Sequence, residues 1–193
     1  MPILANNQLW WYTARSSGVV AWIMLTASVL AGLALSTRAF GARPRPNWLL
    51  DLHRFLGGAA VVFTGTHLLS LFLDTFVTFG PAELLIPFAS SYRPSAVAWG
   101  VVAAYLLAAV EITSLLRKHL SKRAWRATHF LSFPLFVLAS VHAITAGTDS
   151  DTPLLRAAVF GGAATAAALS AVRVMQIEEH EVPSATQSTP SVR

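Results

Sequence analysis

The chain alternates between long apolar stretches and short polar connections. The apolar stretches cover roughly residues 17–36, 50–74, 95–116, 127–147 and 154–174. A run of roughly 20 apolar residues is long enough to cross the hydrocarbon core as an α-helix, which satisfies its own backbone hydrogen bonds there. The pattern therefore predicts an all-α integral membrane protein, a bundle of about five transmembrane helices.

Composition supports this class and excludes several kinds of site. Hydrophobic residues make up 54% of the 193-residue chain and charged residues only 12%, roughly half the charged fraction of a typical soluble domain. We expect no large soluble domain beside the spans. The chain contains no cysteine, which excludes disulfides, thiolate metal sites, Cys-ligated iron–sulfur clusters and covalently attached haem.

Two segments outside the spans have their own character. Residues 75–94, TFVTFGPAELLIPFASSYRP, carry aromatic residues and prolines, and we expect them to lie at the outer membrane interface and cap the bundle. Residues 176–193, QIEEHEVPSATQSTPSVR, are polar and rich in Pro, Ser and Thr, which is typical of disorder. The sequence therefore predicts a membrane bundle over residues 1–175 and a disordered cytoplasmic tail over residues 176–193.

The basic residues between the spans predict how the bundle is oriented. They gather in the first and third connections: Arg38, Arg43, Arg45, Arg117, Lys118, Lys122, Arg123 and Arg126. Because basic connections stay on the cytoplasmic side, we expect the N-terminus outside and the C-terminus inside. The net charge of +5 then reflects membrane orientation, and we expect no nucleic-acid partner.

Four histidines lie within the apolar spans. His53 and His67 are 14 residues apart in the second span, and His129 and His142 are 13 apart in the fourth. These steps correspond to about 21 and 20 Å along a helix, and the predicted topology makes the two spans parallel. The spacing predicts two His–His pairs at different depths, as two bis-histidine b-type haems require: His53 with His129 at the inner side, and His67 with His142 at the outer side.

Two other interpretations of the histidines are open. They could be buried structural residues bonded to neighbouring helices, although four histidines paired in depth favour ligation over this reading. They could bind zinc, but the two pairs are too far apart to share one ion, and no thiolate or carboxylate lies beside either pair. Gly57, Gly58 and Gly65, near the histidines of the second span, would allow a flat macrocycle to approach, although taken alone they favour close helix packing.

The fourth span requires a distortion if both of its histidines are to face the second span. At about 100° per residue, 13 residues leave His142 about 140° from His129 around a regular helix. Pro134 lies between them and lacks a backbone N–H. We therefore predict a break or kink near Pro134 that turns the outer half of the span.

The segments HRFLGGAAVVFTGTH and HFLSFPLFVLASVH resemble the paired histidine motifs of the ferric reductase-like transmembrane superfamily, which includes ferric reductases and NADPH oxidases. Weaker similarity in YTARSSGVVAW, PFASSYRP, TSLLRKHLSKRAWRATH and HAITAGTDS extends it over roughly residues 10–150. The resemblance implies a bacterial plasma-membrane protein with two haems b. His53 and His129 would ligate the inner haem, and His67 and His142 the outer one.

The chain departs from larger family members in two ways. They have six spans and a cytoplasmic domain that binds FAD and NADPH, whereas this sequence has five recognisable spans and no G-x-G-x-x-G motif. We therefore expect no FAD or NAD(P)H site on this chain. Its electrons would come from a separate flavoprotein reductase or from quinol.

Haem propionates need cationic partners, and four arginines are candidates. They are Arg54 and Arg126 at the inner side, and Arg15 and Arg93 at the outer side. An arginine pairs well with a carboxylate because its guanidinium donates two hydrogen bonds. For any single arginine, the role of an interface anchor or a topology determinant is slightly favoured over that of a propionate partner.

Four further residues near the predicted sites are open to two readings. We expect Trp125 to be an interfacial aromatic. Glu111 could handle protons or pair with the basic loop, and Asp149 and Asp151 could attract a cationic acceptor or simply end a loop.

The leading hypothesis is a transmembrane electron carrier, an oxidoreductase component that passes cytoplasmic electrons to an extracytoplasmic acceptor. The acceptor would be ferric iron, dioxygen or a partner enzyme. Such a role requires no general base or nucleophile, and none is evident. The alternatives are a haem-bearing, quinone-linked anchor for a separate redox enzyme, and a haem-free permease or structural bundle.

Overall fold

The structure, a computed structural model, describes residues 2–37 and 47–181, with the side chains of residues 8–37 and 47–176. These parts are helical and contain no strand. The helices are α1 (Pro2–Thr37), α2 (Asn47–Leu73), α3 (Pro81–Leu85), α4 (Pro94–Leu115), the 3₁₀ turn η1 (Arg117–His119), α5 (Lys122–His129), α6 (Ser132–Ala146) and α7 (Pro153–Glu181).

Five helical segments in the described parts are long and apolar enough to cross a membrane. They are Gln8–Thr37, Asn47–Leu73, Pro94–Leu115, Lys122–Ala146 and Pro153–Gln176. The fourth of them comprises α5 and α6 together. The prediction of an all-α membrane bundle with about five spans is therefore confirmed. The first helix begins at Pro2, well before the predicted apolar stretch of residues 17–36, because the helix also includes the more polar residues that precede this stretch.

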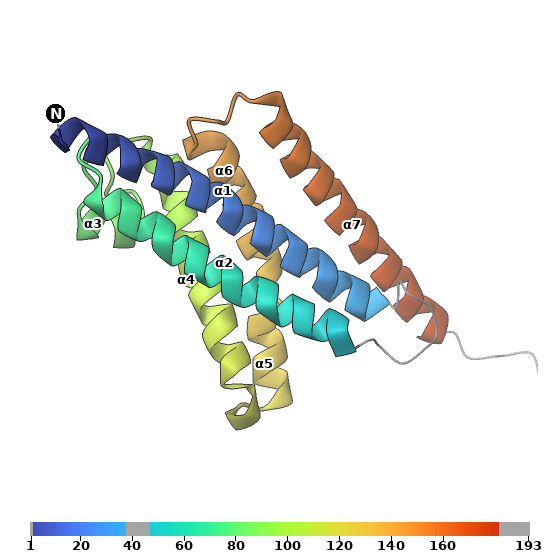
Figure 1. Cartoon of the computed structure of the whole chain (residues 1–193). Helices are drawn as coiled ribbons and strands as arrows, with labels where there is room; N and C mark the ends of the chain where they lie inside the picture. The colour runs from blue at the N-terminus through green and yellow to red at the C-terminus, as the bar shows by residue number, and fades with distance from the viewer. Residues whose placement is uncertain (1, 38–46, 182–193) are drawn as a thin grey trace, which may run out of the picture.

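The spans pack in antiparallel pairs. α1 and α2 lie side by side along most of their length, α4 packs against α5 and α6, and α7 lies against α1 and α6 (Figure 1). The helices that carry the four histidines, α2 on one side and α5 and α6 on the other, are not packed closely against each other. Apolar side chains between the pairs form the core: Leu25, Val29, Leu33, Ala60, Ala103, Leu107, Leu135, Phe136 and Ala166.

One end of the bundle carries the start of α1, the end of α2 and the short helix α3 (Figure 1). We call it the outer end, following the charge-based orientation, which stays a prediction. The predicted orientation rests in part on three arginines that lie outside the described residues: Arg38, Arg43 and Arg45. At the other end α7 continues to Glu181, so residues 176–181 of the predicted tail are helical. The rest of that tail, 182–193, lies outside the described residues.

The predicted distortion of the fourth span is confirmed. α5 ends at His129 and α6 begins at Ser132. At this break the amide of Leu131 donates to the carbonyl of Thr128 (3.0 Å), and the amide of Phe133 donates to the carbonyl of Phe130 (3.2 Å). These are 3₁₀-type bonds, which turn the chain by about 120° per residue. They form here because Pro134 has no N–H to offer the carbonyl four residues before it.

Candidate functional site

The structure brings the four intramembrane histidines together in two pairs. The ring centroids of His53 and His129, the inner pair, lie 6.0 Å apart with an interplanar angle of 78°. Those of His67 and His142, the outer pair, lie 6.4 Å apart with an angle of 75°. Each gap has room for one metal ion bonded to a nitrogen of both rings, because metal–imidazole bonds are about 2 Å long.

Three of the four rings are held in the same way by a neighbouring helix. Nδ1 of His53 lies 2.8 Å from the carbonyl oxygen of Ser28 on α1. One turn further along α1, a Cβ added to Gly32 would lie only 3.2 Å from the His53 ring. The ring therefore sits over a carbonyl at one position and a glycine four residues later. We call this arrangement a carbonyl–glycine seat.

His67 and His142 have seats of the same composition. Nδ1 of His67 lies 2.7 Å from the carbonyl oxygen of Ala14, and Nδ1 of His142 lies 2.8 Å from that of Ala96. The glycines four residues later are Gly18 and Gly100. An added Cβ would lie 3.0 Å from the His67 ring at Gly18, and 2.6 Å from the His142 ring at Gly100.

The seats determine which ring nitrogen is free. A carbonyl oxygen only accepts hydrogen bonds, so the Nδ1 that faces it carries the proton and donates. The Nε2 atom then keeps its lone pair, as a metal-ligating imidazole requires. In His53, His67 and His142 the main chain of α1 or α4 thus fixes both the tautomer and the ring orientation.

His129 has no such seat. Its Nδ1 is buried without a hydrogen-bond partner among the described residues. The ring instead stacks on Trp125, one turn earlier in α5, with centroids 5.0 Å apart and an angle of 22°. The guanidinium carbon of Arg117 lies 4.5 Å from the centroid of the Trp125 ring. The expectation that Trp125 is a simple interfacial aromatic missed this stacking.

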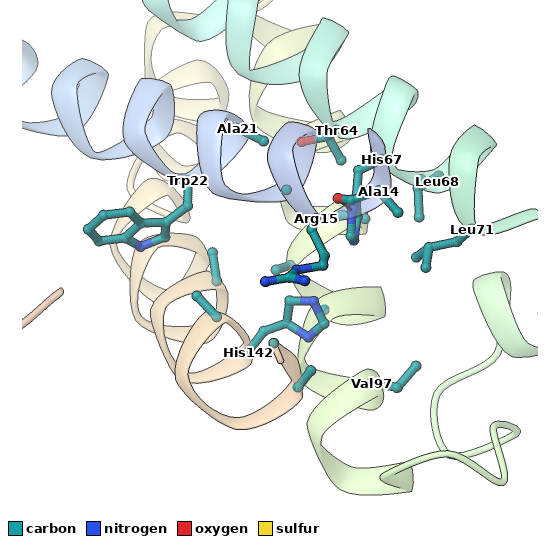
Figure 2. A pocket seen from close by; sticks show the side chains of 18 of the residues that line it. Ala14, Arg15, Ala21, Trp22, Thr64, His67, Leu68, Leu71, Val97 and His142 are labelled. Carbon is teal, nitrogen blue, oxygen red and sulfur yellow. Dashed lines mark hydrogen bonds between the residues drawn. The ribbon is translucent and has the colours of Figure 1, made fainter. Parts of the chain in front are cut away.

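A cavity of about 230 Å³ surrounds the outer pair. It extends from Leu25 and Leu107 in the core to Phe79 in the segment between α2 and α4. That segment therefore covers the outer end of the cavity, as predicted for residues 75–94. Figure 2 shows the side chains of Arg15, His67 and His142 pointing into the same space.

The cavity wall contains one arginine–carboxylate pair. Arg15 donates from Nε to Oδ2 of Asp149 over 3.1 Å, and its NH2 group contacts Oδ1 of the same carboxylate. Asp151, the other acidic residue of this loop, pairs with Arg156 over 2.6 Å. Both aspartates of this loop, Asp149 and Asp151, therefore form an ion pair with an arginine. Asp74 also lines the cavity, is 3% exposed, and has one carboxylate oxygen without a partner among the described residues.

The other three candidate arginines lie at the protein surface. Arg93 has a left-handed backbone conformation (φ 40°) at the start of α4 and donates to the carbonyl of Thr145 over 2.8 Å. The side chain of Arg54 is 61% exposed and lies 3.5 Å from Asp51. Arg126 is exposed. Of the four arginines, the structure brings only Arg15 into the cavity with the histidines.

The glycines singled out in the second span differ from those that contact the rings. Gly58 and Gly65 are exposed, and an added Cβ would meet nothing within 4 Å. Gly57 is buried against Glu111, whose Oε1 would lie 2.5 Å from an added Cβ. In this structure Gly57 thus accommodates a carboxyl group, and the glycines against the histidine rings are Gly18, Gly32 and Gly100.

Sequence reasoning missed the three glycines of the seats, although a signal was present. Gly18 and Gly32 are 14 residues apart, the same step that separates His53 from His67. Two antiparallel helices with matching steps meet at both positions. The signal could be read only by comparing α1 with α2.

The donor set fits haem. Each pair supplies two facing imidazoles, and the described residues contain no group of three or more His, Cys, Asp or Glu side chains that could hold a metal ion. Two opposed imidazoles suit an iron whose other four ligands come from a porphyrin. The side chains between the two histidine-bearing sides are mostly apolar, as a macrocycle prefers.

No curated protein and no solved structure matches the chain. A family model described as "Ferric reductase like transmembrane component" matches residues 17–140. This range contains His53, His67 and His129 and ends two residues before His142. It covers more than half of the sequence and confirms the resemblance carried by the histidine motifs: the chain belongs to the family of ferric reductase-like transmembrane components, which usually bind haem.

Proposed function

We propose that the protein carries electrons across the membrane through two haems b, one ligated by His53 and His129 and one by His67 and His142. Its family indicates a membrane redox component. The observation that carries the proposal is the pair of facing imidazoles at each of two depths, with centroids 6.0 and 6.4 Å apart. His53 and His67 are 14 residues apart, about 21 Å along α2, so the two sites are stacked across the membrane.

The chain contributes ligation, orientation and surroundings. When bound, haem supplies the one-electron chemistry of its iron. The carbonyl–glycine seats keep Nε2 of three histidines directed away from the helix that holds them. The core side chains between the sites are apolar, which lowers the dielectric constant between the two pairs.

The electron donor and acceptor belong to the proposal as classes. The donor is a separate flavoprotein reductase or quinol at the cytoplasmic side of a bacterial plasma membrane. The acceptor is ferric iron, dioxygen or a partner enzyme at the outer side. Because Asp149 and Asp151 are each paired with an arginine, we assign neither of them to the attraction of a cationic acceptor.

The purified protein tests the proposal. We expect Soret and α bands that sharpen and shift on reduction with dithionite, and about two haems per chain. His67→Ala or His142→Ala should each remove about one haem, and the double variant should lose no more than either single variant, because both residues hold the same cofactor.

His119→Ala is the matched control, since His119 is exposed in the η1 turn. It should keep the wild-type haem content. A wild-type protein without haem bands would refute the proposal. Additive losses in the double variant would refute the pairing.

A further inference from the structure

The inner and outer pairs differ at one histidine, because only His129 lacks a carbonyl–glycine seat. α4 is antiparallel to the span formed by α5 and α6, and it seats His142 on Ala96 and Gly100. Around the unbroken helix α4, a step of 13 residues from Ala96 and Gly100 turns by about 140°, so α4 does not repeat this seat on the same face for His129.

A stack of side chains holds the ring of His129. Trp125 lies against one face at 5.0 Å and 22°, and Arg117 lies 4.5 Å from the Trp125 centroid. Offset stacking and cation–π contacts orient a ring but accept no proton from it. His129 is also the last residue of α5, directly before the break, so less continuous helix surrounds it than surrounds the other three histidines.

We propose that Trp125 is the positioning residue for His129, and that its stacking contact makes His129 the most easily displaced of the four ligands. This inference rests on the proposed function. A hydrogen bond from Nδ1 to a carbonyl raises the basicity of a metal-ligating imidazole and fixes its orientation. Three ligands have that bond. His129 is held only by a side chain, so the inner site is where an external ligand enters.

Carbon monoxide binding to the dithionite-reduced protein tests the inference, because this ligand binds only where a histidine leaves the iron. The His67→Ala background removes the outer haem and leaves the inner site to be observed alone. In it we expect Trp125→Ala to bind carbon monoxide several-fold faster than the parent. The low-spin electron paramagnetic resonance signal of the inner site should also shift or broaden.

Two more variants separate stacking from mere volume. Trp125→Phe keeps a ring and should restore slow binding, whereas Trp125→Leu fills the space without a ring and should resemble the alanine variant. Trp48→Ala is the control at the same end of the bundle, at a position 58% exposed, and should leave the rate unchanged.

The outcomes also separate this inference from the proposed function. A leucine variant that behaves like the parent, or an alanine variant with unchanged rate and resonance signal, would overturn the role of Trp125 while leaving the haem proposal intact. A wild-type protein without haem bands would end both.

Discussion

The outer and inner pairs each consist of two facing imidazoles but are supported by different parts of the chain. In the outer pair, main-chain carbonyls of two helices, α1 and α4, hold both rings, and glycines leave the rings their space. In the inner pair, main chain holds His53 and a side-chain stack holds His129. Main-chain support cannot be removed by mutation but tolerates no added bulk, whereas side-chain support can be altered gradually.

The largest expected effect comes from filling an outer seat. Gly100→Ala would place a Cβ 2.6 Å from the His142 ring, whose Nδ1 is held by the carbonyl of Ala96 one turn earlier on the same helix. Overpacking of this kind costs about 1–3 kcal/mol. We expect loss of about one haem, with the inner site retained, measured by haem content and by the remaining resonance signal.

Gly58→Ala is the matched control for this change. An added Cβ meets nothing within 4 Å there, and alanine is the better helix former by about 1 kcal/mol. Full haem content and unchanged or slightly higher thermal stability are expected. If the Gly58 variant lost haem as the Gly100 variant does, the seat would not be the cause.

The second prediction tests whether Pro134 causes the break in the fourth span. Pro134→Ala supplies the missing N–H, so the span can form a regular helical bond to the carbonyl of Phe130. A regular helix would place His129 and His142 on different faces. We expect one of the two low-spin resonance signals to weaken or shift. Two unchanged signals would show that the break does not depend on the proline.

The third prediction concerns the ion pair between Arg15 and Asp149 at the outer end. The side chains of Arg15 and Asp149 are 34% and 33% exposed, so their mutual contribution is about 1 kcal/mol or less. Arg15→Gln and Asp149→Asn should each lower the melting temperature slightly. The double variant should lose less than the two separate losses combined, as a double-mutant cycle would measure. Fully additive losses would contradict a direct interaction.

Part of this architecture could be predicted from the sequence. Apolar runs predict helices, and the fixed rise of a helix converts the spacing of His53, His67, His129 and His142 into depth. Pro134 predicted the break because a missing N–H is a local property. The structure confirms the helices and the break. The roles of the histidines as haem ligands stay a prediction.

The supporting groups could not be predicted in the same way. A seat depends on the register between two helices, which the pattern of either helix alone does not contain. The arginines show the same limit: their charge fits propionates, yet only Arg15 lies in the cavity with the histidines, and Arg54, Arg93 and Arg126 lie at the surface. The stacking of Trp125 on His129 could not be predicted either, because it depends on where the His129 ring points.

The break before Ser132 has a consequence for how the two sites can diverge. The regular ladder of helical hydrogen bonds stops between His129 and His142, so a small rotation of α6 is not passed on rigidly to α5. Each half of the span can therefore be adjusted to its own site. In the proposed carrier with two haem sites, a single residue without an N–H would give the two sites this independence.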